Sequence, residues 1–204
     1  EEPSSQEDLE KIPMLTRADI SREIAPIYNE EMKIADIPTV FHEIETNGIG
    51  YLDLMFDLSD VPEKDLPMVG LLQAVLGIID TEHYEYGELF NEINRHTGGI
   101  GTSLELYPDV TKVKEKEFKA TFEIKGKALY GQIPFAIRMM KEILTASKLD
   151  DEKRLKEILS MTKTRLQDRF LSAGHSAAAL RAMSYKSPIS KFKDTTNGIE
   201  YYQN

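Results

Sequence analysis

The chain contains no cysteine and no tryptophan among its 204 residues. Without cysteine it can form no disulfide framework, no cysteine-ligated zinc site and no thiol nucleophile, and this composition fits a reducing compartment. No apolar run reaches the roughly 20 residues that a membrane-spanning helix needs. The initial Glu1-Glu2-Pro3 is not a signal peptide. We therefore expect no membrane partner for this chain.

Positive charge is also scarce. The chain has 35 acidic and 25 basic residues, which gives a net charge of −10. Nucleic-acid binding depends on Lys and Arg that neutralise phosphates, so this balance argues against a nucleic-acid partner. With 41% hydrophobic and 29% charged residues the composition is that of an ordinary globular protein. A chain of this length buries roughly 70% of its unfolded surface, so its core needs no covalent staples.

The common catalytic motifs are missing as well. The sequence has no Gly-x-Ser-x-Gly elbow, P-loop or dinucleotide fingerprint. Ser172 and His175 are close in sequence, but a catalytic triad is assembled by folding rather than by adjacency. Gly98-Gly99-Ile100-Gly101 lies between a predicted helix and a predicted strand, where it is typical of a helix cap. The residues themselves predict no catalytic, cofactor-binding or metal-binding site.

The four histidines do not form a metal-binding pattern. His83 lies near Glu85 and Glu88, but no second histidine follows it at the helical spacing that a zinc site uses. A surface helix start that is rich in acidic residues is the favoured interpretation. The other histidines are interpreted as ordinary residues of a strand, a helix end and a loop: His42, His96 and His175.

Hydrophobic periodicity predicts the secondary structure. Leu52, Leu54, Phe56 and Leu58 alternate with polar positions, which indicates a strand with one buried face. Thr46-Asn47-Gly48 precedes it, and Asn-Gly is the strongest short signal for a two-residue hairpin turn. We therefore predict a β-hairpin over Ile37–Leu58.

The remaining pattern predicts helices and a second hairpin. Apolar residues from Met68 to Ile79 recur at i, i+3, i+4 and i+7, which indicates a largely buried helix. The further expected elements are a helix near 86–96, strands near 100–106 and 118–124, a helix after Gly131, and a long helix that starts at Asp150-Asp151 and breaks near Gly174.

These elements predict an α+β fold, a two-layer arrangement of an antiparallel sheet of at least four strands with helices on one face. We expect Leu52, Leu54, Phe56, Phe118 and Phe122 to be buried against those helices. Residues 1–35 are expected to form a linker with a short helical extension near Ile20, Ile24 and Ile27. Residues 36–204 are expected to form the α+β domain.

Several separate short motifs of the sequence, in the same order along the chain, resemble those of a known family. They are Thr46-Asn47-Gly48-Ile49-Gly50-Tyr51, Asp57-Leu58-Ser59-Asp60-Val61-Pro62, Thr97-Gly98-Gly99-Ile100-Gly101, Tyr107-Pro108-Asp109 and Ser172-Ala173-Gly174-His175. Together, over about residues 30–204, they resemble the third, non-catalytic domain of the presequence-protease branch of the pitrilysin/insulinase zinc metallopeptidases. The resemblance implies a pitrilysin-like or processing-peptidase-like metallohydrolase domain fold.

In that family the first domain carries His-x-x-Glu-His on the helix after the first hairpin, together with a downstream Glu. The histidines bind zinc and the Glu activates water. When the motif is aligned with this chain, its His, Glu and His positions correspond to Val69, Leu72 and Gln73. Glu88 and Glu92 on the next helix therefore have no zinc site to complete. The resemblance therefore implies a chain that holds no zinc, with the zinc in the catalytic half of the full-length protein. No functional residue is carried over.

The resemblance also implies the setting of the domain. It would form part of the C-terminal wall of a chamber in which unstructured peptides are degraded, with the catalytic N-terminal half of the same polypeptide and peptide substrates as partners. The alternative is a stand-alone peptide-binding or assembly module of the same fold. The domain is expected to continue beyond residue 204, so we expect the isolated fragment to self-associate as a homodimer. We expect a cytoplasmic location, or alternatively the mitochondrial matrix or another organelle.

Overall fold

The computed structural model describes residues 5, 7–8, 11, 14–23, 28–109, 111–112 and 117–203. The chain divides into two compact units, residues 1–45 and 46–204. The predicted domain start at residue 36 stays a prediction. Within the described residues, no helix combines the length and the apolar character that a membrane crossing requires.

The first unit contains a small two-stranded sheet. Strand β1 (Glu30–Ile34) pairs antiparallel with β2 (Ile37–Phe41), and Ile34 lies opposite Ile37. The turn between them places Ala35 and Asp36 at φ values of 48° and 65°. Two successive positive φ values are those of the tight turns that match the twist of a hairpin.

The predicted short helix near Ile20 is not formed as expected. Residues 17–19 form a turn, and Thr16 and Asp19 are joined by a hydrogen bond from the Thr16 amide to the Asp19 carboxylate. Positions 24 and 27, on which that prediction also rested, lie outside the described residues.

The second unit is built on a three-stranded antiparallel sheet with the strand order β3-β5-β4. The strands are β3 (Ile49–Asp57), β4 (Ile100–Pro108) and β5 (Phe118–Leu129). β5 is central and pairs with a full nine residues on each side, which places Phe122 between Phe56 and Leu104. The helices are η1 (Glu63–Asp65), α2 (Leu66–Val75), α3 (Tyr86–His96), η2 (Tyr130–Gln132), α4 (Ile133–Thr145), α5 (Glu152–Ser172), α6 (Gly174–Ser184), α7 (Pro188–Asn197) and α8 (Ile199–Gln203).

The hairpin predicted over Ile37–Leu58 is wrong, although its turn exists. Asn47 and Gly48 have φ values of 51° and 82°, and the Ile49 amide donates to the Thr46 carbonyl. However, residues 37–41 pair with 30–34, and residues 49–57 pair with β5. The described residues therefore form one three-stranded and one two-stranded sheet, not one sheet of four or more strands. The local signal predicts the turn, but it does not predict the strand partner.

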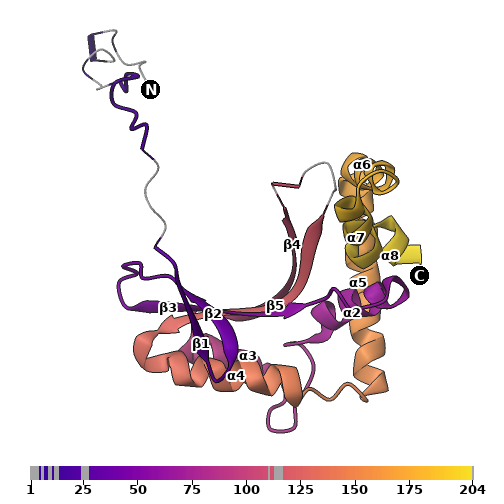
Figure 1. Cartoon of the computed structure of the whole chain (residues 1–204). Helices are drawn as coiled ribbons and strands as arrows, with labels where there is room; N and C mark the ends of the chain where they lie inside the picture. The colour runs from indigo at the N-terminus through magenta and orange to yellow at the C-terminus, as the bar shows by residue number, and fades with distance from the viewer. Residues whose placement is uncertain are drawn as a thin grey trace. The chain divides into compact units, whose positions relative to one another are not determined.

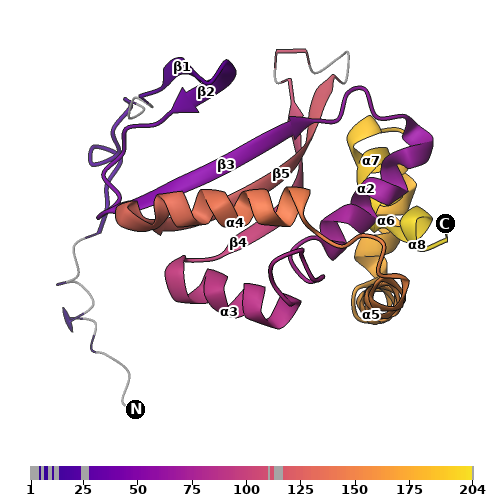
Figure 2. The ribbon, with the colours of Figure 1, turned by 90° about the horizontal axis from the view of Figure 1, so that it is seen from below.

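The helices cover one face of the three-stranded sheet, as predicted. Helices α3 and α4 lie along the sheet, and α2, α5, α6, α7 and α8 gather at one end of it (Figures 1 and 2). The main core is formed by buried residues of β5, α3 and α4 and of the turn after α2: Leu76, Leu89, Ile93, Phe122, Ile124, Met139, Met140 and Ile143. The α+β prediction is confirmed.

Burial on the edge strand differs from the prediction. Phe122 and Ile124 on the central strand are buried, but Leu54 and Phe56 on β3 keep 42% and 45% of their surface exposed. Both β3 and β4 lie at the edges of this sheet, but Leu104 and Leu106 of β4 pack against the core clusters, whereas Leu54 and Phe56 of β3 do not. The alternating pattern therefore identified the strand but not its position at the sheet edge.

The helix termini agree well with the sequence signals. Asp151 caps α5 by accepting the Arg154 amide at 2.9 Å, and Pro134 lies in the first turn of α4. The α5–α6 break falls at Ala173, directly before Gly174. The helix predicted to reach Ile79 ends earlier, at Val75, because the chain turns at Gly77 with a φ of 87°. Ile79 is nevertheless fully buried, in the turn that follows.

Candidate functional site

The positions aligned with the His-x-x-Glu-His motif of the resembled family lie on α2, in the first half of the second unit. Val69 and Leu72 pack against the main core, where they contribute apolar contacts and no electron pair for a metal. The backbone carbonyl of Gln73 accepts a hydrogen bond from Thr102 on β4 at 3.1 Å. These side chains do not fit a zinc ion, and no metal-dependent step is assigned to them.

The histidines serve structural contacts. His83 lies before α3, with its Nδ1 3.0 Å from Glu142 on α4, and its backbone amide donates to the same carboxylate. Burial acts to raise the pKa of Glu142, but hydrogen bonds from Thr81 and His83 outweigh it and lower this pKa. His96 ends α3, with its ring 4.7 Å from that of Phe135. Among the described residues, no three metal-ligating side chains gather at one point.

His42 and the pair Ser172 and His175 show no catalytic arrangement. His42 follows the end of β2 and is exposed. The Ser172 hydroxyl donates to the Asp168 carbonyl of its own helix at 2.8 Å, while His175 lies in the first turn of α6. Among the described residues no hydrogen bond joins the two side chains, and the helix break at Ala173 separates them. Glu88 is exposed in the first turn of α3, and Glu92 pairs with Arg95 at 2.7 Å.

A polar network that sequence reasoning missed lies on the sheet face opposite the helices. Glu123 on β5 is fully buried and accepts hydrogen bonds from Tyr107 (2.7 Å) and Thr121 (2.5 Å). Lys125 lies 2.8 Å from the same carboxylate and also contacts Asp53 and Glu105. The network joins all three strands. The regular alternation of apolar and charged residues along β5 gave no sign that one of the acidic residues on its outer face, Glu123, would be buried.

These contacts shift the titration of the network. Burial acts to raise the pKa of Glu123, but hydrogen bonds from Lys125, Thr121 and Tyr107 prevail and lower it. The hydrogen bond to Glu123 raises the pKa of Tyr107 to about 12. Burial, and then the neighbouring Glu123 charge, raise the pKa of Asp53. Because Lys125 contacts one carboxylate on each of the three strands, the network is best explained as a set of contacts that holds the strands together.

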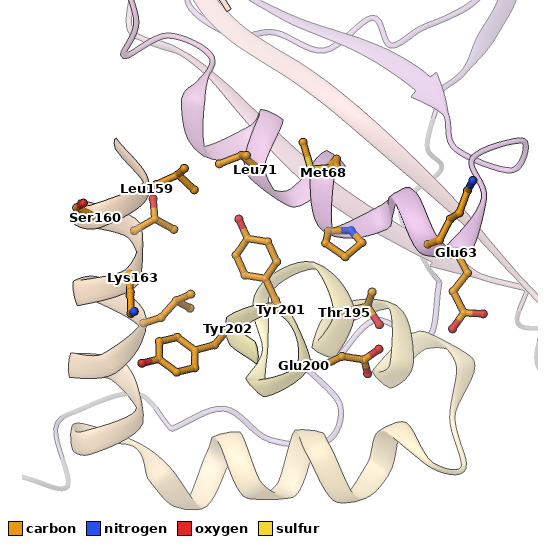
Figure 3. Close-up of a pocket in the computed structure, with 14 residues that line it drawn as sticks. Glu63, Met68, Leu71, Leu159, Ser160, Lys163, Thr195, Glu200, Tyr201 and Tyr202 are labelled. Carbon is orange, nitrogen blue, oxygen red and sulfur yellow. The ribbon is translucent and has the colours of Figure 1, made fainter. Parts of the chain in front are cut away.

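A groove lies between α2, α5 and α8, and its volume is about 1020 Å³ (Figure 3). This volume lies at the upper end of the range for ligand sites. Its walls are mainly apolar, and we refer to it as the α2–α5 groove: Glu63, Lys64, Pro67, Met68, Leu71, Leu159, Ser160, Thr162, Lys163, Leu166, Thr195, Glu200, Tyr201 and Tyr202. It contains no group of acids, bases or nucleophiles arranged for catalysis.

The wall formed by α8 is held by a charge network. The fully buried Asp194 on α7 accepts a 2.6 Å bond from Arg181 on α6 and the backbone amide of Ile199, the first residue of α8. Glu200 on α8 accepts bonds from Arg181 (2.8 Å) and Lys191 (2.5 Å). Its pKa is lowered, mainly by Lys191 and then by Arg181, against the effect of burial. Three short helices are thereby fixed at one side of the groove.

Comparison with known proteins identifies relatives for the whole chain. The family model that describes the domain associated with subfamily C of the M16 peptidases matches residues 1–204. The chain is 36% identical to Protein HypA of Clostridium perfringens over 98% of its own length, and 26% identical over its full length to Presequence protease 1, chloroplastic/mitochondrial, of Arabidopsis thaliana. It is also 26% identical, over 97% of its length, to the mitochondrial presequence protease of Mus musculus.

The chain spans about a fifth of the length of these curated relatives, 20%, 18% and 19% respectively. The match therefore concerns one part of proteins that are much longer.

Proposed function

We propose that this chain forms part of the wall of a chamber in which a zinc-dependent catalytic half degrades unstructured peptides. The basis for the proposal is that the chain belongs to this family of peptidase-associated domains and is a non-catalytic part of an M16 peptidase. One observation carries the non-catalytic role. Of the α2 positions aligned with His-x-x-Glu-His, Val69 stands in place of a zinc-binding His and Leu72 in place of the water-activating Glu, and both pack against the core. Restoring a metal site there would require charged or polar groups in place of core contacts.

The proposed partners are the catalytic N-terminal half of the same polypeptide and its peptide substrates. The names of two relatives refer to presequence proteases, and that activity belongs to those proteins. The acidic balance of this chain, −10, is compatible with basic peptides in a shared chamber. Zinc, in this proposal, belongs to the catalytic half and supplies the activated water there.

The test separates the chain from the full-length protein. We expect the purified 204-residue chain to cleave no quenched fluorescent peptide and to retain no stoichiometric zinc after dialysis. The full-length protein should cleave the same peptide and lose activity with a zinc chelator, and returned zinc should restore it. Peptide cleavage by the chain alone, purified away from other proteases, or stoichiometric zinc held by His83 with Glu85 or Glu88, would refute the non-catalytic role.

The alternative is a stand-alone peptide-binding or assembly module of the same fold. It would be favoured if the full-length protein carried no His-x-x-Glu-His helix in another part. Reading that sequence is the cheapest discriminating observation. For location, the cysteine-free composition fits a reducing compartment, and we propose the cytoplasm. The alternative is the mitochondrial matrix or another organelle, and the names of two relatives refer to mitochondria or chloroplasts. Immunogold labelling or cell fractionation would distinguish the two.

Self-association of the isolated chain also stays a prediction. Within the described residues, strand β3 pairs with another strand on one side only, and it exposes Leu54 and Phe56. Exposed apolar edge strands favour pairing with another chain. Light scattering over a wide concentration range should show a dimer. A monomer throughout that range would contradict the prediction.

A further inference from the structure

The α2–α5 groove has the walls of a protein-docking site. Pro67, Met68 and Leu71 of α2 line one side and Leu159 and Leu166 of α5 line the other. Met68 keeps 63% of its surface exposed and Leu159 44%, although both face a concave surface. Apolar side chains at helical spacing on two walls match the way an amphipathic helix is held, with its apolar face in a hydrophobic groove.

The end of the groove formed by α8 offers a hydrogen-bonding group. Tyr201 is half-buried, burial raises its pKa, and its hydroxyl makes no hydrogen bond within the described part of the chain. Figure 3 shows this hydroxyl pointing into the space between α2 and α5, towards Leu71 and Leu159. A tyrosine combines an apolar ring with a polar hydroxyl, so this hydroxyl is available to a group that enters the groove. In contrast, Tyr202 already accepts a 2.8 Å bond from Gln167, and Lys163 lies over its ring.

The rim of the groove carries unpaired positive charge. Lys64, next to the start of α2, and Lys163 on α5 form no ion pair with any residue that the structure describes. Glu63 and Glu200 on the same rim are engaged by Lys191. The free charge at the groove is therefore basic, on a chain whose net charge is −10. A helix with carboxylates beside its apolar stripe would complement both walls and both lysines.

We propose that the α2–α5 groove is the docking site for an amphipathic, acidic-flanked helix from another part of the same long polypeptide. This inference rests on the proposed function, because it assumes that the chain works as one domain of a longer protein. The matched region is only 20% and 18% of two curated relatives, so ample polypeptide exists in such proteins to supply the helix. The helix would insert apolar residues between Met68 and Leu159 and place a hydrogen-bond acceptor at the Tyr201 hydroxyl.

Site-specific photocrosslinking in the full-length protein tests the occupant directly. Benzoylphenylalanine at Ser160, which lines the groove, is compared with the same residue at Met161, which is exposed on α5 but does not line it. We expect Ser160→benzoylphenylalanine to crosslink, within one polypeptide, to an acidic amphipathic segment outside these 204 residues. Met161→benzoylphenylalanine should not reach that segment.

Charge reversal at the rim sharpens the test. Lys64→Glu combined with Lys163→Glu should reduce the crosslink yield roughly two- to tenfold, as expected for the loss of two exposed ion pairs. The matched control is Lys153→Glu, which lies on α5 away from the groove and should leave the yield unchanged. Circular dichroism of each variant checks that the fold is retained.

Other results would overturn the inference. Crosslinking to a second copy of the protein, to an added peptide substrate, or to nothing would each show that no helix of the same polypeptide occupies the groove. Crosslinking does not depend on peptidase activity. An empty groove in a fully active peptidase would therefore overturn only this inference, and an occupied groove in an inactive protein would count only against the proposed function.

Discussion

The two flanks of helix α2 are packed very differently. On the flank towards α7, Gly70 is buried, and a Cβ atom there would clash with the Thr196 carbonyl oxygen and lie 3.2 Å from the Tyr201 ring. On the flank towards α5, Met68 is largely exposed in a groove of about 1020 Å³. Helix α2 is thus closely packed on the flank towards α7 and open on the flank towards α5. The open flank is the surface on which we propose that a helix of the same polypeptide docks.

The largest expected effect comes from breaking the charge network that holds α7 against the closely packed flank. Arg181→Met would leave the fully buried Asp194 without its cationic partner, although the Ile199 amide still donates to it. Asp194 is fully buried and the Arg181 side chain is 31% exposed, so removing the cation should clearly lower the free energy of unfolding. Urea unfolding followed by circular dichroism measures the loss.

Arg181→Lys is the matched variant, and it should recover part of that stability. Equal stability of Arg181→Met and the natural chain would show that Asp194 is satisfied by backbone donors alone.

The next effect tests the tight contact itself. Gly70→Ala adds a methyl group where Thr196 leaves no room, so α7 must shift, and overpacking of this kind costs about 1–3 kcal/mol. The control is Gly87→Ala on α3, where nothing lies within 4 Å of the added Cβ. Because alanine is the better helix former, this control should gain about 0.5–1 kcal/mol. Thermal unfolding of both variants gives the comparison, and similar changes in both would refute the close contact.

A smaller, pH-dependent effect should appear at α8, which contributes to both flanks. The pKa of Glu200 is lowered by Lys191 and Arg181, so its ion pairs stabilise the fold above its ordinary pKa near 4.5. That contribution is lost as pH falls below 4.5 and through the lower pKa of the folded state. Hydrogen exchange of residues 199–203 should therefore accelerate in acid, after correction for the intrinsic rate. Glu200→Gln should remove this part of the pH dependence, and an unchanged profile in that variant would contradict the assignment.

The smallest effect is expected on the open flank. Met68→Lys replaces a side chain that is already largely exposed, so the stability of the isolated chain should change by no more than about 0.5 kcal/mol. The same substitution in the full-length protein should be clearly destabilising if a helix fills the groove, because a charge would then be buried. Thermal unfolding in both settings measures the difference, and equal small changes in both would indicate an open groove.

Much of the second unit could be predicted because its signals are local. Helical periodicity identified α3, α4 and α5, Asp151 marked the start of α5, and Gly174 marked its end. Each of these signals acts within a few residues of the element that it specifies. That Val69 and Leu72 carry no electron pair for a metal likewise follows from residue type alone, without any knowledge of the fold.

Partner choice could not be predicted in the same way. Asn47-Gly48 specifies a turn, but only the assembled sheet decides that residues 49–57 pair with β5 and leave one edge open. The enclosure of Glu123 and the groove beside Met68 likewise depend on side chains distant in sequence. Sequence by itself determined the class of fold, the family and those elements of the second unit that have a local signal. Tertiary structure alone decided which apolar faces are covered, because burial depends on contacts that no local pattern contains.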